Sequence, residues 1–283
     1  MRLSQAHLTS LETCLRKFQQ SYLEQIVAPT SPDDQSRREW GTQFHLMMQQ
    51  YELGVSSSTY STTSTETSPL HKTFLASVTA LAAQLSNVFD RDQSSNRLSE
   101  HRRVLEISAD HGQSYLLSAV YDLVFFEAHQ ATIFDWKTYR RPKHPQWLST
   151  HWQTRLYPFI LAETSEYEAS QIAMTYWFVR AHDGKAIAPQ SITFPYDQAQ
   201  HDATRQTIQT LLNTLSTHLS AYEQGTQMPK IDEEKGVCGE CPFALRCGRS
   251  PHTAPSSFIE SAALLDIEHM AEVFIGDEQH RVR

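Results

Sequence analysis

Three charged residues interrupt two apolar segments near the middle of this 283-residue chain. Asp122 lies within Ala119–Phe125, and Asp135 and Lys137 lie within Ile133–Lys137. Charged side chains inside buried strands are costly unless they are paired or bind a metal ion. A structural salt bridge between an aspartate and the lysine would explain the pattern, and so would a metal site.

The spacing predicts that the three residues share one face of a hairpin. If their segments form a symmetric hairpin with Ala128 and His129 at its tip, Asp122 lies directly opposite Asp135. Lys137 is two residues after Asp135, so its side chain points the same way. A divalent cation removes the repulsion between two adjacent carboxylates. A lysine beside that cation can position water or stabilise developing charge, which is the chemistry of phosphodiester hydrolysis.

Five further polar residues are candidates for the same site. Glu106 lies on the preceding predicted strand, and Glu100 lies just before that strand, so either could add a third carboxylate. Gln153 and Tyr157 are four residues apart on a predicted helix and therefore share a face. His45 lies on another predicted helix. Taken singly, helical His and Gln residues are more often solvated or structural.

The order of these residues resembles the RecB-like branch of the PD-(D/E)XK nuclease superfamily. The resemblance covers about residues 8–250 and rests on Gly41-x-x-x-His45, Asp122, Asp135-x-Lys137 and Gln153-x-x-x-Tyr157. It implies an α/β fold, a restriction-endonuclease-like mixed β-sheet flanked by helices. It also implies that the metal, Mg²⁺ or Mn²⁺, is bound by His45, Asp122 and Asp135. Lys137 would be catalytic, and Gln153 and Tyr157 would complete the site.

Three of the four cysteines lie close together in Cys238-x2-Cys241-x5-Cys247, and Cys14 is alone near the other end. Without a secretion signal, metal binding is favoured over disulfides. Four thiolates can bind zinc or an iron–sulfur cluster, and the spacing alone does not separate the two. The arrangement is similar to that of AddB-type and CRISPR-associated RecB-like exonucleases. That resemblance implies a [4Fe–4S] cluster held by all four cysteines.

Apolar periodicity predicts the elements that position these residues. It predicts helices over 4–28, 35–53, 70–88, 145–163 and 197–223, and strands over 103–109, 114–127, 132–138, 172–179 and 191–194. We expect one domain over 1–283, with a mainly helical part over 1–98 that contains a Ser/Thr-rich loop over 54–69. A nuclease core over 99–225, a cysteine tail over 226–250 and a C-terminal helix or tail over 251–283 follow.

Composition narrows the range of partners. The net charge of −8 provides no overall basic field for a polyanion, although a groove can be locally basic. Candidate phosphate contacts are Arg140, Arg141, Lys143 and Arg155, and candidate stacking residues are Trp136, Trp147 and Trp152. No apolar run reaches the roughly 20 residues of a membrane-spanning helix. We therefore expect a cytoplasmic protein without a membrane partner.

The sequence thus predicts a metal-dependent deoxyribonuclease, and more specifically an exonuclease. The predicted substrate is single-stranded DNA or DNA ends in repair, recombination or defence, with a helicase or a repair or defence protein as a further partner. The alternative is a noncatalytic nuclease-like iron–sulfur scaffold that binds DNA or a protein partner. A third interpretation, a zinc- or cluster-bearing interaction module, requires no carboxylate pair.

Overall fold

The computed structural model describes most of the chain. The described residues are 1–28, 32–54, 69–90, 96–110, 112–139, 141–179, 181–182, 185–186 and 188–249. The predicted C-terminal helix or tail over 251–283 lies outside them, and so does the predicted Ser/Thr-rich loop apart from its two end residues. Within the described part, no helix has the length and apolarity needed to cross a membrane.

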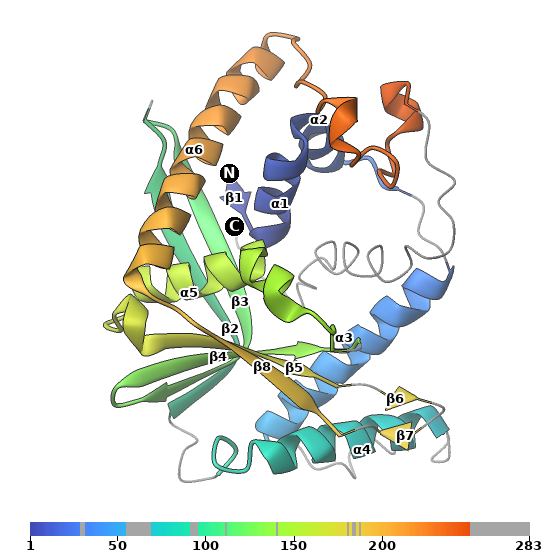
Figure 1. The fold of residues 1–283 in the computed structure, drawn as a ribbon, viewed down its shortest axis with the longest axis vertical. Coiled ribbons are helices and arrows are strands. Elements are labelled where there is room, and N and C mark those ends of the chain that lie inside the picture. Colours follow the sequence, from blue (N-terminus) through green and yellow to red (C-terminus); the bar gives the residue numbers. More distant parts are fainter. Residues whose placement is uncertain are drawn as a thin grey trace, which may run out of the picture.

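A mixed β-sheet forms the centre of the molecule (Figure 1). Its strands are β1 (Arg2–Leu3), β2 (Arg97–Ser108), β3 (Ser114–Glu127), β4 (Gln130–Lys137), β5 (Ile172–Phe178) and β8 (Gln190–Pro195). The strand order is β1-β3-β4-β5-β8, and β2 pairs along β3. β1 runs parallel to β3, and β4 runs parallel to β5, whereas the other neighbours are antiparallel. A short pair, β6 (Ala181–His182) and β7 (Lys185–Ala186), stands apart from this sheet.

Helices pack on the sheet in two hydrophobic cores. α1 (Gln5–Thr13), α5 (Trp152–Glu163) and α6 (Gln198–Glu223) contribute to the main core, where apolar residues of β3, β4 and β5 meet them. α3 (Pro32–Glu52) and α4 (Pro69–Gln84) form a second core with Leu123, Phe125, Phe134 and Trp136, which alternate along β3 and β4 with residues of the main core and so point to the opposite face of the sheet. Figure 1 shows α3 and α4 together below the sheet, away from α1 and α6. The predicted mixed α/β fold is confirmed.

The predicted helix over 4–28 is interrupted at Cys14. α1 ends at Thr13, and the extended backbone of Cys14 (φ −165°, ψ 115°) separates it from α2 (Leu15–Phe18) and a π-helical turn, η1 (Gln19–Leu23). The Arg16 N–H donates to the Pro229 carbonyl at 3.1 Å, and Arg16 Nε donates to the Met228 carbonyl at 2.7 Å. The break therefore places α2 against the segment that leads into the cysteine tail.

Two other boundaries differ from the predicted ones in ways that matter for the site. The predicted helix over 145–163 is divided at His151 into a 3-10 helix, η4 (Pro145–Thr150), and α5. β2 begins at Arg97, six residues before the predicted strand, which brings Glu100 into the sheet. Further 3-10 turns are η5 (Ala169–Gln171), η6 (Glu233–Lys235) and η7 (Leu245–Cys247).

Candidate active site

β3 and β4 form the predicted hairpin and then separate at the candidate site. Their ladder has the predicted register and ends at Leu123 and Phe134, one pair before Asp122 and Asp135. Beyond that pair, the Trp136 N–H donates to Asp122 Oδ2 at 2.6 Å. We call this separation the fork. At the fork, Asp122 lies on β3 and Asp135 lies on β4, and side-chain contacts replace the pairing between the two strands.

Glu100, not Glu106, lies beside Asp122 at the fork. β2 pairs with β3 on both sides of Glu100, Ser99 with Leu123 and His101 with Tyr121, so Glu100 lies level with Asp122. Its backbone has a φ of +46°, in the left-handed region that non-glycine residues adopt only at a cost of about 1–3 kcal/mol. Glu106 is exposed and lies farther along β2, opposite Leu116. The left-handed backbone of Glu100 thus belongs to the geometry that places its carboxylate near His45 and Asp122.

His45, Glu100 and Asp122 bring three potential ligand atoms within 4.8 Å of one another. His45 lies on α3, with Nδ1 3.1 Å from Asp122 Oδ1 and Nε2 3.0 Å from the Trp136 carbonyl oxygen. Two carboxylates suit Mg²⁺ or Mn²⁺, and the imidazole favours the transition metal of the two. Within the residues that the structure describes, no other set of three His, Cys, Asp or Glu side chains is grouped this closely. The donor set fits a divalent cation.

Lys137 is the centre of a second polar cluster beside this group. Its Nζ lies 2.7 Å from Asp135 Oδ2 and donates to Gln153 Oε1 at 2.7 Å. Gln153 Nε2 in turn donates to Asp135 Oδ1 at 2.5 Å. Asp135 is only 4% exposed and Lys137 only 9%. The aspartate–lysine ion pair is therefore present, and it is buried beside the candidate metal ligands.

The crowded acidic groups disturb one another's ionisation. Burial raises the pKa of Asp135 and outweighs the Lys137 cation that lowers it, which gives about 6. Burial also raises the pKa of Glu100 to about 7, and the negative charge on Asp122 adds to this. Burial lowers the pKa of His45, but the neighbouring carboxylates outweigh burial and raise it to about 9. Without a cation, the site therefore keeps protons that metal binding would release.

Glu52, at the end of α3, is an acidic neighbour that sequence reasoning missed. Burial raises its pKa to about 8, and the charges on Asp122 and Glu100 act in the same direction. The signal was available, because Glu52 follows His45 by two helical turns and so lies on the same face of α3.

Two residues near Lys137 were also missed. His151 precedes α5, and burial together with the Lys137 cation lowers its pKa to about 4, so its ring is neutral near pH 7. Tyr139 follows Lys137 by two residues, and burial together with the Asp135 charge raises its pKa. Tyr139 continues the alternation of Asp135 and Lys137, which was the signal for it.

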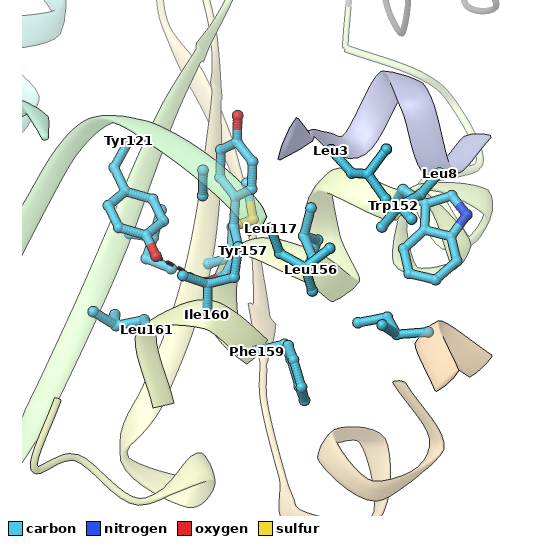
Figure 2. Packing of buried hydrophobic residues seen from close by; sticks show 14 of the residues in the cluster. Leu3, Leu8, Leu117, Tyr121, Trp152, Leu156, Tyr157, Phe159, Ile160 and Leu161 are labelled. Carbon is cyan, nitrogen blue, oxygen red and sulfur yellow. Dashed lines mark hydrogen bonds between the residues drawn. The ribbon is translucent and has the colours of Figure 1, made fainter. Parts of the chain in front are cut away.

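Tyr157 packs in the main hydrophobic core, as Figure 2 shows. It is 2% exposed, and its ring meets that of Tyr121 edge to face with centroids 5.4 Å apart. The Tyr121 hydroxyl donates to the Tyr157 carbonyl at 3.1 Å. Gln153 lies one turn earlier on α5, at the end that reaches Lys137. The role of Tyr157 in the site stays a prediction.

A family model for the PD-(D/E)XK nuclease superfamily matches residues 2–248. The chain belongs to this superfamily. The match spans the fork, the His45–Glu100–Asp122 group and the Lys137 cluster, and it reaches the last of the tail cysteines. Divalent metals are the cofactors of PD-(D/E)XK nucleases, and the grouped imidazole and carboxylates are a candidate site for one.

Comparison with other proteins adds two solved structures of low similarity. A search of curated proteins found no match. The protein SSO0001 is 15% identical, with a TM-score of 0.37 over 87% of this chain and 85% of that one. A protein from Eubacterium rectale, described as a "putative exonuclease", is 11% identical, with a TM-score of 0.49 over 91% of each chain. Because both TM-scores are below 0.5, the assignment to the PD-(D/E)XK superfamily rests on the family model.

The candidate DNA contacts of this PD-(D/E)XK chain divide into buried and exposed residues. Trp136 and Trp152 are each 2% exposed and belong to the cores, which corrects the expectation that they stack on bases. Arg155 lies over the Trp152 ring at 4.2 Å and lines a cavity of about 240 Å³ between η4, α5, β8 and α6. Trp147 is partly exposed. Arg141 and Lys143 are exposed, and Arg140 lies outside the described residues.

The four cysteines come from both ends of the PD-(D/E)XK chain into one region. Burial raises the pKa of the Cys241 thiol, and the charges of Cys14 and Cys247 act in the same direction, so these three thiols are neighbours. Cys238 Sγ accepts a hydrogen bond from Arg249 Nη1 at 2.7 Å. Although all four cysteines are described, no three of their thiols lie within 4.8 Å of one another. Figure 1 shows α2 close to the tail that carries the other three.

Proposed function

We propose that this protein is a metal-dependent deoxyribonuclease that hydrolyses phosphodiester bonds in single-stranded DNA or at DNA ends. The observation that carries the proposal is the grouping of His45, Glu100 and Asp122 at the fork, next to the buried Lys137. Membership of the PD-(D/E)XK superfamily supplies the class of reaction. The grouped side chains are of the types that such a reaction needs.

Each side chain at the fork has a distinct role in this proposal. A bound Mg²⁺ or Mn²⁺ would polarise the scissile phosphate and activate water. His45, Glu100 and Asp122 would bind it, and we assign Asp135 to it as well. Lys137 holds a positive charge in a buried position, where it can stabilise negative charge that develops on the phosphate. Gln153 orients both Lys137 and Asp135 through its two hydrogen bonds.

We further place the chain in the RecB-like branch and assign exonuclease activity to it. The support is the order of Gly41-x-x-x-His45, Asp122, Asp135-x-Lys137 and Gln153-x-x-x-Tyr157 along the chain. The same resemblance supports a role in repair, recombination or defence beside a helicase or another protein of such a pathway.

We also propose that Cys14, Cys238, Cys241 and Cys247 hold a [4Fe–4S] cluster. Cys14 is a neighbour of Cys241 although more than 200 residues separate them. Four thiolates on one zinc ion, with Zn–S bonds of about 2.3 Å, would lie about 3.8 Å apart. In a [4Fe–4S] cluster each thiolate binds a different iron, so the thiolates lie farther apart. In the structure, no three of the four thiols lie as close together as the ligands of one zinc ion would.

One preparation tests both proposals. We expect protein purified without oxygen to be brown, with broad visible absorbance and about four irons per chain. The same protein should cleave end-labelled single-stranded DNA in the presence of Mn²⁺, and the cleavage should stop when EDTA is added. Stoichiometric zinc without iron would contradict the cluster. A folded, metal-loaded protein that binds DNA but cleaves none would replace the nuclease with the noncatalytic scaffold.

A further inference from the structure

Trp147 and His151 form an aromatic pair at the start of α5. Their ring centroids are 4.3 Å apart with an interplanar angle of 59°. Trp147 belongs to η4, and His151 is the extended residue that separates η4 from α5. Both side chains are partly exposed, and Ser149 and Thr150 between them are exposed. Trp147 also packs against the main core, and both residues keep part of their surface accessible to solvent, unlike the buried Trp136 and Trp152.

The pair adjoins the candidate active site. His151 is close enough to Lys137 for the lysine cation to disfavour the protonated form of the imidazole. Gln153, two residues after His151, accepts a hydrogen bond from Lys137 Nζ at 2.7 Å. The start of α5 thus connects the aromatic pair with the buried lysine. We expect this lysine to face the scissile phosphate.

The segment around the pair is positively charged, although the chain as a whole carries a net charge of −8. No Asp or Glu occurs between Asp135 and Glu163, whereas five Lys or Arg residues do. Arg141 and Lys143 are exposed in the connection that leads from β4 to η4. A polyanion that also offers flat ring faces matches this combination of charge and aromatic surface.

We propose that Trp147 and His151 form a stacking platform for an unpaired base of the substrate, with Arg141 and Lys143 on the adjacent phosphates. This inference rests on the proposed nuclease function and deepens it by naming single-stranded DNA as the preferred substrate. Bases in a duplex are stacked on both faces, so only an unpaired base can lie on the platform. Stacking tolerates any sequence because every base has a π face.

Binding without cleavage gives the first test. In EDTA, the protein is titrated with a fluorescent oligothymidylate and with a hairpin duplex of equal length. We expect Trp147→Leu and His151→Ala each to weaken binding of the single strand about tenfold and to leave duplex binding unchanged. Trp147→Phe, which keeps an aromatic ring, should retain most of the affinity. The matched control is Tyr167→Leu, which removes a partly buried ring stacked on Phe126 near the tip of the β3–β4 hairpin.

Cleavage of oligonucleotides that carry one abasic nucleotide gives the second test. At one position relative to the cleaved bond, the missing base should lower wild-type kcat/KM about tenfold, and Trp147→Leu should show no such loss. The platform is overturned if the abasic penalty persists in Trp147→Leu, or if the variants bind single strands as the wild type does. Trp147-dependent binding without any cleavage would overturn the nuclease and keep the platform. Cleavage of single strands that does not depend on Trp147 or His151 would keep the nuclease and overturn the platform.

Discussion

The fork and the cysteine region are both candidate metal-binding regions, but they are assembled in different ways. At the fork, strand register and α3 place His45, Glu100 and Asp122 within 4.8 Å of one another. The thiols approach from both chain ends, and no three of the four come as close. Backbone ladders fix the fork, whereas turns carry the tail cysteines. We therefore expect a removable cation at the fork and a metal centre that is part of folding at the cysteines.

The largest expected effect is a loss of hydrolysis when a charged residue at the fork is removed. Mn²⁺ binding then distinguishes the metal ligand from the neighbouring positive charge. Asp135→Ala and Lys137→Ala should each reduce hydrolysis about a hundredfold or more, because each removes one key electrostatic group. Only Asp135→Ala should weaken Mn²⁺ binding, since an ammonium group is not a metal ligand. Calorimetric Mn²⁺ titration and a gel-based nuclease assay measure the two effects. DNA binding without metal should survive in both variants, and wild-type cleavage by both folded variants would show that the pair is structural.

The second test concerns the cysteine region. Cys14→Ala should lose iron and thermal stability as fully as Cys241→Ala. Either change removes a ligand of the proposed cluster, which connects α2 with the tail. By analogy with a disulfide that closes a loop of this length, the melting temperature should fall by roughly 10 °C. Thr13→Ala, next to Cys14, is the control and should keep its iron. EDTA treatment of the wild type should leave the melting temperature almost unchanged. Full iron content in Cys14→Ala would show that Cys14 is not a ligand of the cluster.

The difference between the two regions also explains what the sequence could predict. The β3–β4 hairpin and its register followed from Asp122 and Asp135 within apolar strands, because a period of two fixes which side chains share a face. Glu100 could not be chosen over Glu106 from the pattern alone. Its strand is largely polar, and its left-handed φ is set by tertiary structure.

Other errors arose where one predicted helix is two elements. The breaks at Cys14 and His151 interrupt apolar patterns that continue through them, so periodicity gave no sign of either. Gln153 and Tyr157 both lie on α5, as predicted, but the pattern did not indicate how deep each side chain lies, and the role of Tyr157 in the site stays a prediction. Gln153 is in the first turn and reaches Lys137, whereas Tyr157 is one turn deeper in the core.

A smaller effect tests whether Glu100 belongs to the metal-binding group at the fork. Glu100→Gln should weaken Mn²⁺ binding about tenfold, because one negative ligand becomes neutral while its size is kept. Glu106→Gln changes the same side chain six residues along β2, where it is exposed, and should bind Mn²⁺ as the wild type does. Equal affinities for the two variants would remove Glu100 from the metal site.

The smallest expected effect is the pH dependence of the metal-free protein. Between pH 7 and 9, the folded protein loses protons from His45 (pKa about 9) and Glu52 (pKa about 8) that the unfolded chain has already lost. The stability that these protons contribute is therefore lost as the pH rises through this window. Thermal unfolding in EDTA should show a melting temperature that falls from pH 7 to pH 9, and a smaller fall in Glu52→Gln. A rise with pH would contradict the raised pKa values.

The fork has a consequence for the solubility of the protein. Where β4 leaves β3, the first half of β3 would present unpaired backbone groups on that edge, and such edges invite strands of other molecules. β1 lies at this position, with its residues paired to Leu116 and Leu117 and the Leu116 N–H donating to the Met1 carbonyl at 3.0 Å. Leu3 is completely buried there. The first three residues thus cover the start of the β3 edge that the opening of the fork exposes, and we expect them to hinder aggregation there.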